Sequence, residues 1–147
     1  MTTSTQVQLI ERPIGTSTPD NFTPATVDLP EPRQDEVRVR NEYVSVDPYM
    51  RGRMNASTSY IPPFGLNEAM TGGAVGRVVE SNSGTLPVGV AVLHDYGWRD
   101  VAQGPAAHFS ALPRTELPLS AFLGAAGMTG LTAYMSESEL GVSGRRR

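Results

Sequence analysis

The order of apolar and polar positions divides the chain into a long β-rich part and a shorter helical part. From Gln6 to about Leu112, short runs rich in β-branched and aromatic residues alternate with Pro, Gly, Asn and Asp. Runs separated in this way by turn residues are typical of a small all-β barrel or sandwich. The strands that the pattern predicts cover residues 7–10, 36–46, 74–80, 88–93, 98–102 and 108–111.

The longest predicted strand, 36–46, cannot be flat. Val37 and Val39 share one face of a regular strand, whereas Val44 falls on the other face. One extra residue in a strand of an antiparallel pair bends the strand and changes which face the following side chains occupy. The pattern therefore predicts a β-bulge near Asn41-Glu42.

A helical turn is predicted directly after this strand. Asp47 can cap amide groups, and Pro48 suits the first helical position, where its missing N–H would have no partner in any case. Tyr49 would then sit at a strand end. The next segment, 58–70, contains prolines and a glycine without a sustained period, which indicates a long surface loop at the border of a pocket.

After Leu117 the apolar positions recur with helical spacing. The two sets are Leu119, Phe122, Leu123 and Ala126, and then Leu131, Tyr134, Met135 and Ser138. They predict two short helices. Pro118 fits the start of the first helix and Gly127 a break between the two. Thr129 fits the cap of the second helix and Gly141 its end.

The length of 147 residues is that of one typical domain. We expect a β-barrel over 1–117, a helix pair over 118–141 and a disordered tail over 142–147. The tail carries three arginines, which is fewer than the five to eight basic residues usual in nucleic-acid-binding patches.

Composition and charge exclude several classes of function. The net charge of −3 gives no basic surface for a phosphate backbone, so we expect no nucleic-acid partner. All 12 basic residues are arginines and cysteine is absent, which excludes Schiff-base lysines, disulfides and thiolate chemistry. With neither a long apolar stretch nor a leader-like start, the sequence predicts a cytoplasmic protein that binds no membrane.

Few residues suggest chemistry by themselves. The two histidines, His94 and His108, match no metal-ligand spacing, so we expect no metal and local hydrogen bonds instead. There is no Gly-x-Ser-x-Gly elbow for a serine hydrolase. The glycines at 72–73 and 124–130 lack the spacing of a dinucleotide loop and are interpreted as packing and turn glycines.

Longer strings of residues resemble a known family. Residues 41–54, NEYVSVDPYMRGRM, continue in register into YIPPF at 60–64 and GGAVGRVVES at 72–81. HDYGWR at 94–99 and LGAAGMTGLTAY at 123–134 extend the match to most of residues 7–141. These strings are similar to the medium-chain dehydrogenase/reductase superfamily, specifically its zinc-independent alkenal/one and prostaglandin reductase branch.

The resemblance implies a GroES-like β-barrel that faces a Rossmann domain across an active-site cleft. It also implies NADP as the cofactor and the C=C bond of an α,β-unsaturated ketone or aldehyde as the reduced group. By this resemblance Tyr49 is the substrate-pocket tyrosine, and Met128 and Thr132 border the nicotinamide. The alternatives are a packing role for Tyr49 and, for Thr132, a hydroxyl that bonds the backbone of its own helix. Arg51 is as consistent with a structural ion pair as with a ligand contact.

The end of the sequence bears on the expected activity. After Leu140-Gly141 a full-length relative would enter the first Rossmann strand, so we expect the Rossmann domain to be absent and this chain to be inactive alone. The alternative function is a free-standing GroES-like module that binds a partner without redox chemistry. Uncovered helices would leave Leu131, Tyr134 and Leu140 exposed and favour a homodimer or other self-association.

Overall fold

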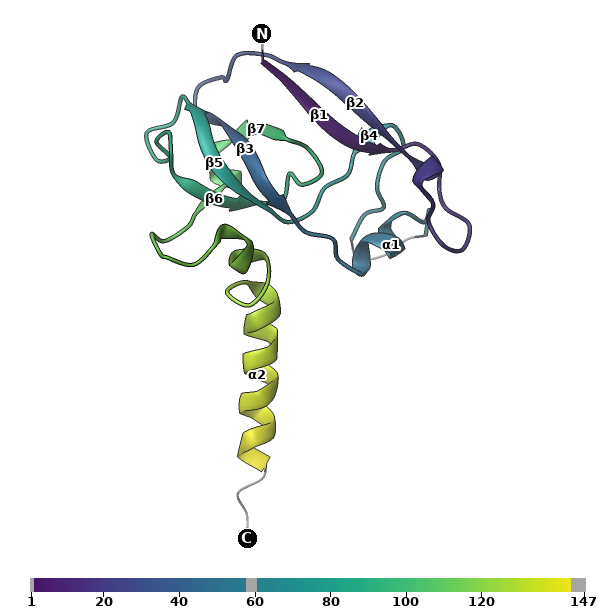
Figure 1. Ribbon diagram of the computed structural model, residues 1–147, viewed down its shortest axis with the longest axis vertical. Coiled ribbons are helices and arrows are strands. Elements are labelled where there is room, and N and C mark those ends of the chain that lie inside the picture. Colours follow the sequence, from purple (N-terminus) through teal and green to yellow (C-terminus); the bar gives the residue numbers. More distant parts are fainter. Residues whose placement is uncertain (1, 58–60, 144–147) are drawn as a thin grey trace.

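The protein folds into two antiparallel β-sheets with a helix standing away from them (Figure 1). The structure is a computed structural model that describes residues 2–57 and 61–143, with side chains up to residue 136. The first sheet has the order β2-β1-β4, and its strands are β1 (Thr2–Leu9), β2 (Phe22–Leu29) and β4 (Glu68–Ala69). The second has the order β7-β3-β5-β6-β8. Its strands are β3 (Glu36–Val44), β5 (Ala74–Ser81), β6 (Ala91–His94), β7 (Val101–Pro105) and β8 (Ser110–Ala111).

The helices are short, apart from the last one. They are η1 (Pro19–Asn21), α1 (Tyr49–Arg53), η2 (Ala106–His108), η3 (Leu119–Leu123) and α2 (Met128–Ser143), where η marks a 3₁₀ helix. The predicted mainly β fold is confirmed. Within the residues that the structure describes, no helix is long and apolar enough to cross a membrane.

The sequence pattern did not predict strand β2, because the strand contains Pro24. Pro24 lies opposite Val7 in the register of β1 and β2. A proline cannot donate to a strand neighbour, which demotes a run to an edge strand or to no strand at all. β2 is an edge strand, with β1 as its neighbour in the sheet, so the missing N–H is tolerated there.

The predicted bulge in β3 is confirmed. Asn41 pairs with Gly76 and Tyr43 with Val75, so Glu42 is the extra residue opposite β5. A second register shift lies between Arg38 and Val39. The bulge does not bury the far end of the strand, however, because Val44 remains 39% exposed. β3 also ends there, whereas the apolar pattern predicted strand as far as residue 46.

Main-chain hydrogen bonds join the two sheets through the segment 98–100. The Val7 amide donates to the Trp98 carbonyl at 2.8 Å, and the Asp100 amide donates to the Thr5 carbonyl at 3.0 Å. Two apolar cores lie within this frame. The first consists of Val37, Val39, Val78, Leu86, Val92, Ala102, Ala106 and Phe109. The second consists of Leu9, Met50, Met54, Phe64 and Met70.

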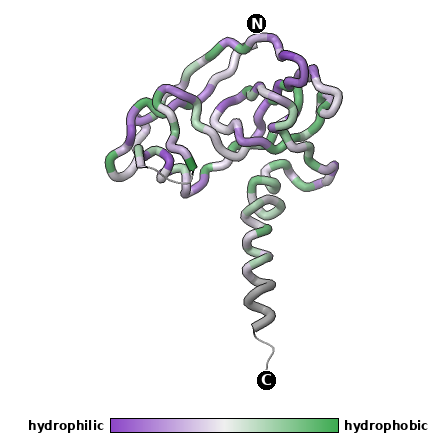
Figure 2. The backbone as a smooth tube through the Cα atoms, turned by 180° about the vertical axis from the view of Figure 1, so that it is seen from behind, coloured by the Kyte–Doolittle hydropathy of each residue, from purple (hydrophilic) through white to green (hydrophobic). Residues whose placement is uncertain are grey.

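The C-terminal helices depart from the predicted boundaries. The first is the 3₁₀ helix η3, preceded by Pro118 as predicted. The second, α2, begins at Met128 rather than at a Thr129 cap, and it continues past Gly141 to Ser143. It therefore includes the first residues of the predicted tail, while 144–147 lie outside the described residues. Figures 1 and 2 both show α2 projecting away from the sheets.

Candidate active site

The turn after β3 places Tyr49 at the edge of the second core. The Ser45 hydroxyl donates to Asp47 Oδ2 at 2.7 Å, and the Met50 amide donates to the Asp47 carbonyl at 3.0 Å. The prediction that the Asp47 side chain caps the helix is wrong, because its carboxylate binds Ser45 and Pro48 is the N-cap. Tyr49 is the first residue of α1 rather than a strand end.

Helix α1 has a buried and an exposed face. Met50 and Met54 belong to the second core, whereas Tyr49 keeps 43% of its surface exposed. Partial burial raises the pKa of the Tyr49 phenol, and the negative charge of Asp47 adds to this rise. The Arg53 guanidinium opposes it by charge and hydrogen bonding. The phenol therefore stays protonated at neutral pH and can donate a hydrogen bond.

Arg53 is held firmly beside Tyr49. Its Nε donates to the Pro62 carbonyl at 2.9 Å and its Nη1 to Thr71 Oγ1 at 3.2 Å. The guanidinium also lies 4.1 Å from the centre of the Phe64 ring, within the range of a cation–π contact. These contacts give the Tyr49 phenol a fixed cationic neighbour.

The other arginine of the turn is structural. Arg51 donates to the carbonyls of Pro13 and Gly15 and to Asn55 Oδ1. The alternatives for Arg51 were a structural ion pair and a ligand contact. The structure favours a structural role, in which Arg51 links the turn to the loop after β1 through neutral acceptors instead of an ion pair.

A pocket of about 740 Å³ brings Tyr49 and Met128 together. Its lining consists of Ser45, Asp47, Pro48, Tyr49, Gly73, Leu93, His94, Asp95, His108, Ser110, Phe122, Leu123, Met128 and Thr129. The third predicted residue, Thr132, is not part of this lining. Its hydroxyl donates to the Met128 carbonyl at 2.8 Å, which is the backbone bond of the alternative reading.

His94 is a neutral, fully bonded member of the lining. Burial lowers the pKa of its imidazole to about 4, and the positive charge of Arg99 contributes to this effect. Nδ1 accepts the Tyr96 amide at 3.0 Å, and Nε2 lies 2.9 Å from Asn41 Oδ1. The bond to Tyr96 is the local bonding expected from the sequence, whereas Asn41 belongs to the distant strand β3.

His108, the other histidine, has a different environment. It is exposed, and its Nδ1 lies 2.6 Å from the Tyr96 hydroxyl. Asp95 and His108 line the pocket of Tyr49 and Met128. They also line a neighbouring pocket of about 360 Å³, whose other lining residues are Thr71 and Tyr96. The sequence predicted local hydrogen bonds for His108 instead of a metal, and it assigned Asp95 and Tyr96 no role in the site. Among the described residues no group of three or more acidic or histidine side chains could hold a metal ion.

The glycine-rich segments serve packing, as predicted. The Gly97 amide donates to the Gly72 carbonyl at 2.9 Å, so two loops meet there backbone to backbone. A Cβ on Gly72 would collide with the Met50 side chain. At the start of α2, a Cβ on Gly130 would collide with the Ala125 carbonyl.

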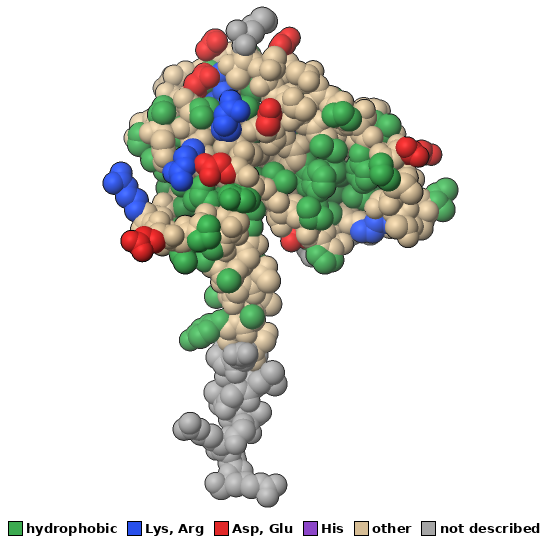
Figure 3. Space-filling model, in the orientation of Figure 1, with side chains coloured by type: hydrophobic (Ala, Val, Ile, Leu, Met, Phe, Trp, Pro, Cys, Tyr) green, Lys and Arg blue, Asp and Glu red, His purple; other side chains and the backbone are tan. Residues whose placement is uncertain are grey.

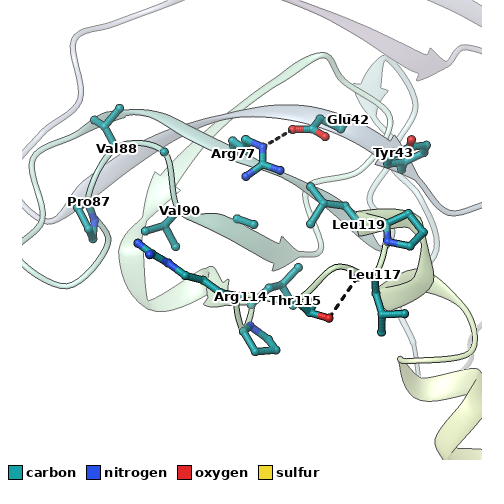
Figure 4. Close-up of a pocket in the computed structure, with 15 residues that line it drawn as sticks. Glu42, Tyr43, Arg77, Pro87, Val88, Val90, Arg114, Thr115, Leu117 and Leu119 are labelled. Carbon is teal, nitrogen blue, oxygen red and sulfur yellow. Dashed lines mark hydrogen bonds and ion pairs between the residues drawn. The ribbon is translucent and has the colours of Figure 1, made fainter.

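A separate hollow of about 730 Å³ lies between β5, β6 and the segment 112–119 (Figure 4). Two arginines line it, Arg77 and Arg114, and Arg77 is already paired with Glu42 at 2.9 Å. Its apolar residues include Val88, Val90 and Leu119. It contains neither Tyr49 nor Met128, so the pocket at α1 remains the candidate active site.

Comparison with known proteins gives a consistent match. Residues 5–112 match the family described as the N-terminal domain of oxidoreductase. The chain is 42% identical over 136 residues to a Bacillus subtilis protein named as an NADP-dependent oxidoreductase, YfmJ, covering 92% of this chain and 40% of that protein. It is 40% identical over 133 residues to the NADPH-dependent curcumin reductase of Escherichia coli, covering 90% of this chain and 39% of that protein.

A solved structure also matches closely. The crystal structure of CurA from Vibrio vulnificus superposes with a TM-score of 0.83 at 42% sequence identity. The match covers 90% of this chain and 39% of that chain. CurA has also been solved in complex with NADPH, with a TM-score of 0.82. The chain thus spans about two fifths of the length of the relatives that it matches.

Proposed function

Because the chain belongs to the family of N-terminal oxidoreductase domains, within the medium-chain dehydrogenase/reductase superfamily, we propose that it forms the substrate side of an NADP-dependent double-bond reductase. The reduced group is the C=C bond of an α,β-unsaturated ketone or aldehyde. The observation that carries this proposal is the pocket that Tyr49 and Met128 line together. A concave pocket of this size that combines apolar and polar side chains is typical of small-molecule sites.

The lining suits one end of the cofactor. Phe122, Leu123 and Met128 offer apolar surface for a flat ring, and Met128 is 77% exposed. Asp47 and Asp95 make the described lining acidic, and it contains no arginine to bind phosphates. The proposed domain division is a barrel over 1–117, a helix pair over 118–141 and a tail over 142–147. Met128, in the helix pair, lines the pocket. When bound, NADPH supplies the hydride for the β-carbon of the substrate.

The role of Tyr49 follows from its protonation state. A raised pKa keeps the phenol protonated, so that its O–H donates to the carbonyl oxygen of the substrate. As negative charge develops on that oxygen in the enolate, a fixed donor stabilises it more strongly than it stabilised the ketone. The Arg53 guanidinium, which the Pro62 carbonyl holds in place, adds positive charge beside the phenol.

A chimera of the chain with a relative tests this function. The corresponding N-terminal part of Vibrio vulnificus CurA is replaced by this chain, and NADPH oxidation is followed with 4-phenylbut-3-en-2-one. We expect turnover by the chimera. The Tyr49→Phe variant of the chimera should lose roughly a hundredfold in kcat, in the range found when one oxyanion donor is removed. The exposed Arg114→Gln variant is the control. A folded chimera without turnover, or full activity in Tyr49→Phe, would contradict the proposal.

The 147-residue chain by itself should not oxidise NADPH, since its described residues form no phosphate-binding glycine loop. Robust turnover by this chain alone would overturn that expectation.

The second candidate function is a binding module without redox chemistry. It is favoured by the two cores and the direct bonds between the sheets, which allow the fold to stand alone. An inactive chimera that still binds the ketone would support it.

A further inference from the structure

Tyr49 shares the pocket with other titratable side chains that could contact a ligand. Five titratable side chains line it: Asp47, Tyr49, His94, Asp95 and His108. The carboxylates are acceptors when ionised, and both nitrogens of His94 already have partners. Only His108 among these groups combines an exposed ring with a nitrogen, Nε2, that has no hydrogen-bond partner among the described residues.

Tyr96 sets the orientation of the His108 ring. The Tyr96 ring stacks on Phe109, with ring centres 5.4 Å apart and an angle of 19° between the planes. It also lies near His108 itself, with centres 6.0 Å apart and an angle of 29°. Gly104 of β7 makes room for the phenol, because a Cβ there would lie 2.9 Å from the Tyr96 hydroxyl oxygen. The hydroxyl is thus held against His108 Nδ1 by packing on two sides.

This contact bears on which nitrogen of His108 carries the hydrogen. Burial raises the pKa of the Tyr96 phenol, although the positive charge of Arg99 opposes the rise, so the phenol keeps its hydrogen and can donate it to Nδ1 when the imidazole carries its hydrogen on Nε2. A neutral imidazole that accepts at Nδ1 carries its hydrogen on Nε2. In that tautomer His108 can donate from Nε2, which has no hydrogen-bond partner among the described residues.

We propose that His108, oriented by Tyr96, is a substrate-binding residue whose Nε2–H donates to the carbonyl oxygen of an α,β-unsaturated ketone or aldehyde in the pocket. The inference rests on the proposed function and adds a second donor to Tyr49. Two donors on one oxygen fix its position and share the charge that develops on it. Tyr96 is a positioning residue, since it acts through His108.

The test uses the 147-residue chain and 4-phenylbut-3-en-2-one as the ligand. The sequence contains two histidines, so long-range ¹H–¹⁵N spectra resolve both imidazoles and His108→Phe assigns them. We expect His108 to be in the Nε2–H form and its Nε2 resonance to move saturably with the ketone, while the resonances of His94 stay in place. The Met128 methyl resonance reports independently on binding in the pocket.

Variants separate hydrogen bonding from simple packing. His108→Phe should raise the Kd for the ketone about fivefold, as expected for the loss of one net hydrogen bond. Tyr96→Phe keeps the imidazole but should shift it to a mixture of tautomers and raise the Kd by a smaller factor. Arg114→Gln, beside the other hollow, should leave the Kd unchanged.

The outcomes distinguish this inference from the function on which it rests. The role of His108 is contradicted if the ketone moves the Met128 methyl resonance but not the His108 Nε2 resonance. It is also contradicted if folded His108→Phe has an unchanged Kd for the ketone. Neither result contradicts the proposal that the pocket binds the ketone. A His108 ring with its hydrogen on Nδ1 also overturns the role of His108. The absence of saturable ketone binding overturns the pocket itself, and the role of His108 with it.

Discussion

At the scale of single residues, Arg38 is a buried charge with a complete set of partners. Its side chain is 1% exposed. Nε and Nη2 donate to Gln103 Oε1, Nη1 to Thr2 and Glu80, and Nη2 also to the Pro30 carbonyl. Only the arginine of the pair is buried, since the Glu80 side chain is 41% exposed. Removing Arg38 is costly mainly because Gln103, Thr2 and the Pro30 carbonyl lose their partner.

Arg38→Met should therefore lower the free energy of unfolding by about 3 kcal/mol. The matched control is Arg77→Met on the neighbouring strand, because Arg77 also pairs with a glutamate but is 53% exposed. Exposed pairs contribute little, so Arg77→Met should cost less than about 1 kcal/mol. Urea unfolding of both variants measures the difference. Equal losses would contradict the role assigned to burial.

His94 makes stability depend on pH. The pKa of its imidazole is about 4 in the folded protein, against 6.5 as the ordinary value. The stability that comes from the neutral ring is complete above pH 6.5 and is lost as the pH falls toward 4. The loss reaches about 3 kcal/mol at the low end, in order of magnitude.

Urea unfolding at a series of pH values checks this expectation. The His94→Gln variant should lose much of the pH dependence between 6.5 and 4, although it is less stable at neutral pH because the ring contacts are gone. If His94→Gln retained the same slope, another group would have to carry the titration.

At the scale of elements, α2 has an uncovered apolar surface. Leu131 is 55% exposed and Tyr134 70%, and Figure 3 shows apolar side chains projecting from this helix below the sheets. Helix α2 packs mainly on η3. Leu140, the third residue expected to be exposed, lies outside the described side chains.

Exposed apolar surface of this kind favours association. In sedimentation velocity, we expect the average mass of the chain to rise with concentration. The double variant Leu131→Glu/Tyr134→Glu should lower that tendency, whereas Ser136→Glu, another exposed position on α2, should not. A wild-type chain that stays monomeric at all concentrations would argue against the self-association proposed from the sequence.

At the scale of the whole molecule, the candidate site depends on segments far apart in the sequence. Tyr49 comes from the turn after β3, His94 from the end of β6, His108 from η2 and Met128 from the start of α2. The segment 98–100 holds the two sheets together by main-chain hydrogen bonds. The chimera tests whether this arrangement, completed by the remaining part of a relative, is that of an active enzyme.

Much of the fold could be predicted from local patterns. Alternation and turn residues predicted most strands of the second sheet, the change of apolar parity in β3 predicted its bulge, and the change to helical spacing predicted helices after Leu117. Tyr49 and Met128 were named through family resemblance. That they line the same pocket is visible only in the tertiary structure. The role of Thr132 could not be separated from its alternative, because a helix-face hydroxyl can reach either a ligand or its own backbone.

The sequence by itself determined what depends on neighbouring residues: strand periodicity, turns, the start of η3 after Pro118 and the family to which the strings belong. Tertiary structure decided which strand side chains are buried by residues from other segments of the chain. Arg38 alternates with Val37 and Val39 and therefore reads as exposed, yet Thr2 and Pro30 from beyond the sheet bond to it and bury it. In the same way the contact of Tyr96 with His108 depends on how the chain folds back between β6 and η2, which no local pattern of apolar and polar residues predicts.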